Sequence, residues 1–231
     1  MSIAWFVHAL DADIGRQIVR EFEEVATEAR FPAEPRVTWA QPGQFEDLTL
    51  NRARAWALEN PDGFVLYTHT KGAYHNSFYV VRATGKAITP GFNDLWRMAM
   101  SDRLIGPWPS RIADLREHDA AGLFWITAES NPEFTIDPRF GPHFGGNFWW
   151  ARADYLARLP ELPRLTKFTR EQAEMWLGSG NPKVRALTQG YEALPLPGIR
   201  ALPEDLMHVV GITAEEAERN FAAGGGQRYE Y

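Results

Sequence analysis

Three short stretches of this sequence carry polar side chains in patterns that could support chemistry. The first is the string His69-Thr70-Lys71-Gly72, which follows an apolar run at 64–67. It places a proton carrier, a hydroxyl and a cation on a loop, and Gly72 lets the backbone pass closely beneath a ligand. Lys71 suits a diphosphate because its ammonium group is a point charge without a fixed fork geometry. A solvated loop without any function would contain the same residues.

The second stretch joins paired glycines, an amide and three consecutive aromatic residues: His143, Phe144, Gly145, Gly146, Asn147, Phe148, Trp149 and Trp150. Adjacent glycines permit close approach of a backbone to a ligand. The Asn147 amide can both donate and accept hydrogen bonds. Trp149 and Trp150 can face a sugar ring or a base. The alternative is a buried aromatic strand that is entered through a glycine turn.

The third stretch is an amphipathic segment at 171–177. Glu171 and Glu174 lie three residues apart and therefore on neighbouring parts of one helical face. Ala173, Trp176 and Leu177 mark the buried side, which puts Glu174 at the edge of the apolar stripe. A half-buried carboxylate can have a raised pKa and act as a general base. An ordinary solvated helix residue would show the same spacing.

The histidines offer a separate hypothesis. His8, His69 and His143 would have to converge to hold a metal ion, as in a metal-dependent hydrolase, but no two histidines have the spacing His-X-X-X-His. The sequence also contains neither the Gly-X-Ser-X-Gly string of hydrolases nor the Gly-X-Gly-X-X-Gly string of dinucleotide-binding proteins. Arg97, on a predicted helix, is a further candidate cation.

Composition limits the class of protein. The chain has 231 residues, 45% hydrophobic and 23% charged, which is typical of a globular domain. It has no cysteine, which excludes disulfides, thiolate metal sites and thiol nucleophiles. The start of the chain lacks the basic segment of a signal peptide, and no apolar run reaches the ~20 residues of a membrane helix. We therefore expect a cytoplasmic protein without membrane insertion.

The first seventy residues alternate between strand and helix patterns. The predicted strands cover 3–7, 37–40 and 64–67, and the predicted helices cover 14–29 and 45–58. This alternation predicts an α/β fold with a single, mostly parallel mixed sheet flanked by helices. Ligands of such sheets bind outside the carboxyl ends of the strands, where His8 and His69 are expected.

The remaining chain has a mixed pattern. It predicts helices at 93–104, 152–159, 171–177 and 213–221, a strand at 122–127 and a loop at 131–142. We expect one catalytic domain over residues 1–222. The segment 223–231 follows three consecutive glycines, and we expect it to be a flexible tail.

Taken in order, the three stretches resemble a family of small bacterial and phage glycosyltransferase-like proteins that are related to the glycosyltransferase A-type fold. The resemblance covers about residues 44–178, beginning with Phe45-Glu46-Asp47. The string Gly-Gly-Asn-Phe-Trp-Trp at 145–150 is its most specific part. The resemblance implies a nucleotide-binding half, an acceptor half and a nucleotide-sugar donor bound at the carboxyl ends of the strands.

The resemblance also implies roles for individual residues. Glu174 would deprotonate the acceptor hydroxyl, and Lys71 with Arg97 would neutralise the departing diphosphate. The donor side would comprise His8, His69, Thr70, Lys71, Gly72 and Arg97. The acceptor side would comprise His143, Gly145, Gly146, Asn147, Trp149, Trp150 and Arg170.

The sequence departs from the wider fold class at the metal motif. His69, Thr70 and Lys71 stand where that class usually has Asp-X-Asp, and no carboxylate is present there. The resemblance alone would allow Mn²⁺ or Mg²⁺, but this departure argues against a metal cofactor.

The resemblance implies two possible acceptors, a saccharide or a hydroxymethylated base of phage DNA. A DNA acceptor predicts a basic groove beside Trp149 and Trp150, built from Arg152, Arg158, Arg164, Lys167 and Arg170. The formal net charge of −6 favours a saccharide. A non-catalytic module that binds a sugar or nucleotide is the alternative from a different class of protein.

Overall fold

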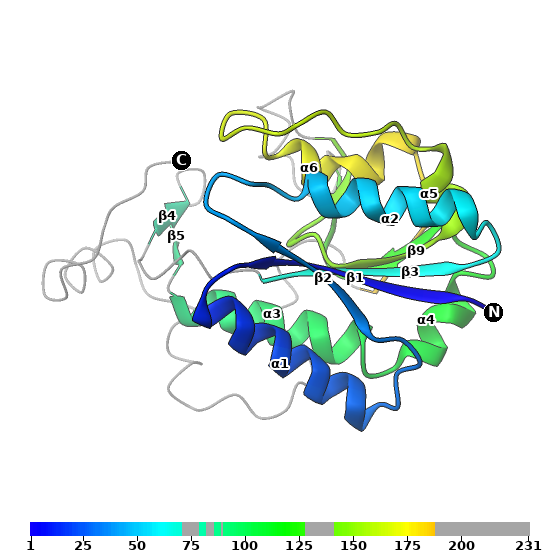
Figure 1. Ribbon diagram of the computed structural model, residues 1–231, viewed down its shortest axis with the longest axis horizontal. Coiled ribbons are helices and arrows are strands. Elements are labelled where there is room, and N and C mark those ends of the chain that lie inside the picture. The colour runs from blue at the N-terminus through cyan, green and yellow to red at the C-terminus, as the bar shows by residue number, and fades with distance from the viewer. Residues whose placement is uncertain (71–78, 82–85, 89, 128–140, 188–231) are drawn as a thin grey trace, which may run out of the picture. The chain divides into compact units, whose positions relative to one another are not determined.

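The computed structural model describes residues 1–70, 79–81, 86–88, 90–127 and 141–187 (Figure 1). The chain divides into two compact units, Met1–Thr70 with Met100–Leu194 and Lys71–Ala99 with Pro195–Tyr231. Lys71, Gly72, most of the predicted loop at 131–142, the predicted helix at 213–221 and the predicted tail lie outside the described residues. No helix among the described residues is long and apolar enough to cross a membrane.

A six-stranded mixed sheet forms the centre of the first unit. Its strand order is β10-β6-β9-β3-β1-β2. The strands are β1 (Ile3–Leu10), β2 (Pro35–Ala40), β3 (Phe64–His69), β6 (Ala120–Gly122), β9 (Trp149–Arg152) and β10 (Val184–Ala186). β9 runs antiparallel to both β3 and β6, and the remaining neighbouring pairs are parallel. The predicted α/β fold with a mostly parallel mixed sheet is confirmed.

The sheet is not the only one. Two two-stranded pairs accompany it, β4 (Tyr79–Val81) with β5 (Lys86–Ile88), and β7 (Trp125–Ile126) with β8 (His143–Phe144). The expectation of a single sheet was therefore too simple. The strand predicted at 122–127 is divided between two sheets because Phe124 adopts a positive φ of 57°, which an extended strand cannot contain.

Helices cover both faces of the six-stranded sheet. The helices are α1 (Asp13–Glu28), α2 (Asp47–Glu59), α3 (Pro90–Leu104), α4 (Trp108–Asp114), α5 (Ala153–Arg158) and α6 (Gln172–Trp176), which continues into the 3₁₀ helix Leu177–Gly180. Within the first unit, α1 and α4 lie on one face, and α2, α5 and α6 lie on the other (Figure 1). The sequence did not indicate α4 or β10.

The order of the first three strands determines where their connections separate. β1 lies between β2 and β3 and is parallel to both. The connection from β1 to β2 passes through α1 on one face, and the connection from β2 to β3 passes through α2 on the other (Figure 1). Parallel crossovers of one hand require this change of face when the strand order reverses. The two connections therefore separate at the carboxyl ends of β1 and β3, which is where such sheets bind ligands.

The aromatic residues of β9 fill the core on both faces of the sheet. Successive strand residues point to opposite faces. Trp149 stacks on Tyr67 with ring centroids 5.1 Å apart, and Trp150 packs against Phe31 on the other face at 5.7 Å. Neither tryptophan is exposed to solvent. The alternative of a buried aromatic strand entered through a glycine turn therefore describes β9, and the two indoles are core residues rather than an open sugar platform.

Candidate functional site

Two histidines lie near the carboxyl ends of adjacent parallel strands, His69 as the last residue of β3 and His8 two residues before the end of β1. His8 of β1 and His69 of β3 are register partners, so their positions are side by side at the carboxyl edge of the sheet. Thr70 joins the two strand ends, since its backbone N–H donates to the carbonyl of His8 and its hydroxyl accepts from the N–H of Leu10 at 3.0 Å. His8 and His69 thus lie at the carboxyl edge, where the sequence placed them, and the assignment of His8, His69 and Thr70 to a donor stays a prediction.

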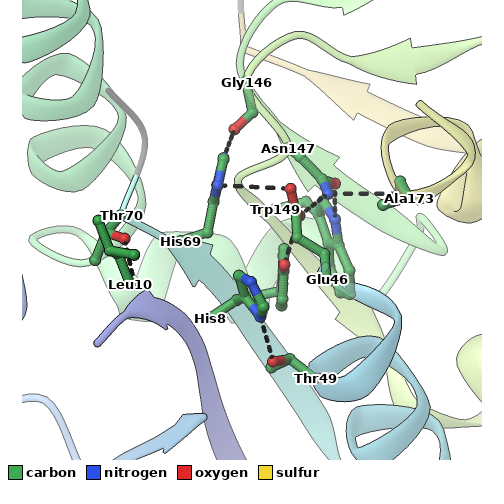
Figure 2. Close-up of polar contacts among 11 residues, drawn as sticks. His8, Leu10, Glu46, Thr49, His69, Thr70, Gly146, Asn147, Trp149 and Ala173 are labelled. Atoms are coloured by element: carbon green, nitrogen blue, oxygen red, sulfur yellow. Dashed lines mark hydrogen bonds and ion pairs between the residues drawn. The ribbon is translucent and has the colours of Figure 1, made fainter. Parts of the chain in front are cut away.

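Glu46 occupies the middle of this edge. It occupies the N-cap position of α2, where the helix dipole favours a carboxylate, and its side chain makes no capping hydrogen bond. Its Oε2 accepts hydrogen bonds of 2.6 Å from the Tyr67 hydroxyl and 2.6 Å from Nδ2 of Asn147. Its Oε1 lies 3.6 Å from Nδ1 of His69 (Figure 2). Glu46 thus contacts side chains from β3 and from the turn that precedes β9.

Opposing effects set the protonation of these groups. Burial by itself would raise the pKa of Glu46, but His69, His8 and the two hydrogen bonds outweigh burial, and the net pKa is lowered. Burial, followed by the charge of Glu46, raises the pKa of Tyr67 well above its ordinary value. Burial lowers the pKa of His8 to about 4. At pH 7 the site therefore holds an ionised Glu46, a neutral Tyr67 and a neutral His8.

The hydrogen bonds of the two histidines fix their orientation. Nδ1 of His8 lies 2.9 Å from the hydroxyl of Thr49 in α2. Nε2 of His69 lies 2.7 Å from the carbonyl of Gly146. A carbonyl oxygen only accepts, so this ring nitrogen carries the proton, and Nδ1 is the atom that faces Glu46.

The turn before β9 depends on its glycines and its asparagine. The N–H of Asn147 donates to the carbonyl of Phe144 at 2.9 Å, and the N–H of Gly145 donates to the carbonyl of Phe124. Gly146 has a φ of 86°, as the third position of a type II turn requires, and Asn147 follows with a φ of 51°. Glycine and asparagine tolerate this left-handed region better than other residues.

Asn147 connects three elements of the site. Its Nδ2 donates to Glu46 at the start of α2 and lies 3.4 Å from the carbonyl of Ala173 in α6. Its Oδ1 accepts from the indole N–H of Trp149 at 2.9 Å (Figure 2). The side chain is 1% exposed. Buried amides with every group paired specify a unique geometry, so Asn147 positions the turn rather than presenting a free amide to a ligand.

Glu174 lies beside this network on α6. Its side chain is 33% exposed, and its Oε2 is 4.0 Å from Nε2 of the buried His143. Its charge contributes to the raised pKa of Tyr67, which places it near the Glu46 cluster. Nδ1 of His143 lies 2.8 Å from the carbonyl of Gly141. Glu174 therefore combines partial solvent access with proximity to the Glu46 cluster, which a proton acceptor for a substrate needs.

Close packing fixes the position of α6. Gly178 follows the helix, and a Cβ atom there would lie 1.7 Å from the carbonyl oxygen of Pro142, so only glycine fits. The indole N–H of Trp176 donates to the carbonyl of Pro160 at 2.7 Å. Asn51 of α2 exchanges two hydrogen bonds of 2.9 Å with the backbone of Leu162 in the loop that leads to α6.

Other predicted residues lie elsewhere. Arg170 is 42% exposed and pairs with Glu171 at 3.4 Å on the surface. Arg97 is buried and belongs to the second compact unit. The assignments of Lys71, Gly72 and Arg97 to a donor stay predictions.

Arg152 and Arg158, two of the five cations that the sequence assigned to a groove for a DNA acceptor, are paired with carboxylates. Arg152 pairs in register with Phe64 at the amino end of β3, whereas His69 is at its carboxyl end, so Arg152 lies at the opposite edge of the sheet. Arg152 and Arg158 both contact Asp154, and Arg158 also lies 3.9 Å from Asp119. These carboxylates neutralise the cations locally.

The residues that the structure describes do not support the three-histidine metal site. Among them, no group of three His, Asp or Glu side chains is arranged to hold a metal ion. Instead, His8 contacts Thr49, His69 contacts Glu46 and Gly146, and His143 faces Glu174.

Sequence reasoning did not identify Glu46 or Tyr67 as site residues. Glu46 appears in the sequence only as a carboxylate in the first turn of a predicted helix, and Tyr67 as one of four apolar strand residues. A tyrosine within two residues of a strand end, followed by a histidine, was a weak signal that a polar partner lies nearby, since buried tyrosine hydroxyls usually have one.

Comparisons with protein-family models and with curated proteins find no match for this chain.

Proposed function

We propose that this protein is a glycosyltransferase that moves a sugar from a nucleotide-sugar donor to an acceptor hydroxyl, with a glycosyltransferase A-like arrangement of its sheet. The observation that carries the proposal is the convergence of His8, His69 and Glu46 at the carboxyl ends of β1 and β3. Sheets whose strand order reverses at such a point bind nucleotides and similar ligands there. The resemblance of the motifs at 69–72 and 145–150 supports the same function.

Glu174 is the proposed general base. It would accept the proton of the acceptor hydroxyl while that oxygen bonds to the anomeric carbon and the bond from this carbon to the nucleoside diphosphate breaks. Glu46 is less suited, because its Oε2 already accepts two hydrogen bonds and its pKa is lowered, which makes it a weaker base. Glu174 has a one-third exposed side chain that a substrate can reach.

A saccharide is the proposed acceptor. Arg152 and Arg158 are paired with carboxylates, and Arg152 lies at the edge of the sheet opposite to His69. A net charge of −6 also disfavours DNA binding.

Thermal-shift measurements with a panel of nucleotide sugars, with and without Mn²⁺, test donor binding, because a ligand of the native state raises the melting temperature. The best donor is then incubated with saccharide acceptors, and release of the nucleoside diphosphate is measured. Glu174→Gln should lower turnover by about 10²–10⁴-fold and leave donor affinity unchanged. Glu171→Gln is the matched control, since Glu171 is 39% exposed and pairs with Arg170 on the surface. No binding of any nucleotide sugar would overturn the proposal, and binding without transfer by the wild type would favour a non-catalytic module.

A further inference from the structure

We infer that Glu46 and His69 together form a subsite for one hydroxyl group of the sugar, an inference that rests on the proposed function. Oε1 of Glu46 and Nδ1 of His69 face each other at 3.6 Å. A direct N–H···O hydrogen bond is about 2.7–3.2 Å long. The two atoms are therefore neighbours without closing a hydrogen bond of ordinary length.

The other polar atoms of both side chains are already used by the protein. Oε2 of Glu46 accepts from Tyr67 and Asn147, and Nε2 of His69 donates to Gly146 (Figure 2). These contacts fix the carboxylate and the ring, so that Oε1 and Nδ1 keep their facing orientation without a ligand. Sites with fixed groups bind more tightly because little side-chain freedom is lost on binding.

The two side chains are also within reach of solvent. Glu46 is 18% exposed and His69 is 14% exposed, whereas Asn147 beside them is almost fully buried. The pair therefore lies at the boundary between the buried core and solvent, near the carboxyl ends of β1 and β3.

A hydroxyl group has the right chemistry for this pair. It donates one hydrogen and accepts through its lone pairs, so it can donate to Oε1 and accept from Nδ1 of the imidazolium form of His69, the form in which Nδ1 carries a proton while Nε2 still donates to Gly146. An oxygen about 2.8 Å from each atom fits two atoms that are 3.6 Å apart. Because Glu46 is ionised, the hydrogen bond to it is charge-assisted. A hydroxyl-bearing ring is the ligand class that follows.

This subsite predicts discrimination between sugars. A site that is built to hydrogen-bond a hydroxyl rejects the analogue that lacks it, because its buried polar groups then stay unpaired. One position of the sugar ring should therefore be essential for affinity, and the others should not depend on Glu46.

Isothermal titration calorimetry tests this with UDP-glucose, GDP-mannose and dTDP-rhamnose, followed by the deoxy-sugar derivatives of the tightest binder. One deoxy derivative should bind about 10–100-fold more weakly to the wild type. Glu46→Gln should bind the parent sugar more weakly than the wild type does, by the same factor. It should bind that deoxy derivative as tightly as the wild type does, which completes a double-mutant cycle. Glu171→Gln should behave as the wild type.

Two substitutions of His69 distinguish recognition of the hydroxyl from a structural effect. They also test the subsite if Glu46→Gln does not fold. His69→Asn keeps an amide donor near the place of Nδ1, and His69→Gln keeps a donor near Nε2 for Gly146. His69→Asn should retain the discrimination between the parent sugar and the deoxy derivative, and His69→Gln should lose it.

If Glu46→Gln weakens the binding of the parent sugar and of every deoxy derivative equally, the subsite is overturned, and sugar transfer by the wild type would still support the proposed function. Absence of binding by all three nucleotide sugars would overturn the proposed function and the subsite together.

Discussion

The buried His8 of β1 should make the stability of the protein depend on pH. Burial lowers the pKa of His8 from 6.5 to about 4 in the folded state. The unfolded chain therefore binds more protons than the folded chain between these two values, and stability rises with pH through this window. The contribution is fully present above pH 6.5 and is lost as the pH falls towards 4.

The size of this effect follows from the two pKa values. The difference between the unfolded pKa of 6.5 and the folded pKa of about 4 lowers the free energy of unfolding by about 3 kcal/mol once the pH is below 4. At pH 5 the loss is about 2 kcal/mol, because the folded histidine is then still mostly neutral while the unfolded one is protonated. His8 is 9% exposed, so solvent screening reduces the effect little.

Substitution of His8 by Asn isolates this contribution. Asn can keep a hydrogen bond to Thr49, whose hydroxyl lies 2.9 Å from Nδ1 of His8, but it does not titrate. Guanidinium unfolding of both proteins between pH 4 and pH 8 gives the free energy of unfolding at each pH. The wild type should lose about 2 kcal/mol more than His8→Asn between pH 7.5 and pH 5. Parallel pH profiles for the two proteins would refute the argument that His8 is buried in its neutral form.

Two further substitutions test the packing of the site. Tyr67→Phe removes a hydrogen-bond donor to the ionised Glu46. Guanidinium unfolding at pH 7 should show a free energy of unfolding that is lower by about 1.5–3 kcal/mol. A change near zero would contradict the 2.6 Å hydrogen bond. Gly178→Ala places a Cβ atom 1.7 Å from the carbonyl oxygen of Pro142 and should cost about 3 kcal/mol or more, visible as a lower melting temperature. Gly141→Ala is its control, because no atom lies within 4 Å of the added Cβ, and equal effects of the two substitutions would show that α6 is not held by this contact.

The early part of the fold could be predicted because its local patterns agree with its packing. Ile18 and Phe22 have helical spacing and form the buried face of α1, and the apolar run that begins at Ile3 becomes the central strand β1. The run extends three residues beyond the predicted end at Val7, so His8 lies inside the strand and not on a loop. Buried parallel strands read as continuous apolar runs, and a single histidine at the end does not interrupt them.

Local sequence patterns were not sufficient to predict that the aromatic residues of β9 are buried. Adjacent Trp149 and Trp150 look like a platform in sequence, but a strand that is covered on both faces buries both of its alternating sides. The covering residues come from distant segments, such as Tyr67 on one face and Phe31 on the other. Without knowledge of these partners the sequence could not distinguish a core from a ligand platform.

Glu46 could not be recognised from sequence for a related reason. Its partner Asn147 is 101 residues away, and the contact exists because the Gly145-Gly146 turn brings Asn147 to the start of α2. A carboxylate before a helix is common, since it stabilises the helix N-terminus. Only the tertiary structure shows that this carboxylate also contacts Tyr67 and faces His69.

Histidine side-chain NMR tests most directly whether the carboxyl edge of β1 and β3 is the ligand site. His8 and His69 lie at this edge, whereas His118 precedes β6 at the opposite edge and contacts the carbonyl of Asp114. Addition of the nucleotide sugar that gives the largest thermal shift should move the ring signals of His8 and His69 and leave those of His118 unchanged. A binding nucleotide sugar that shifts His118 and not the other two would contradict the proposed site.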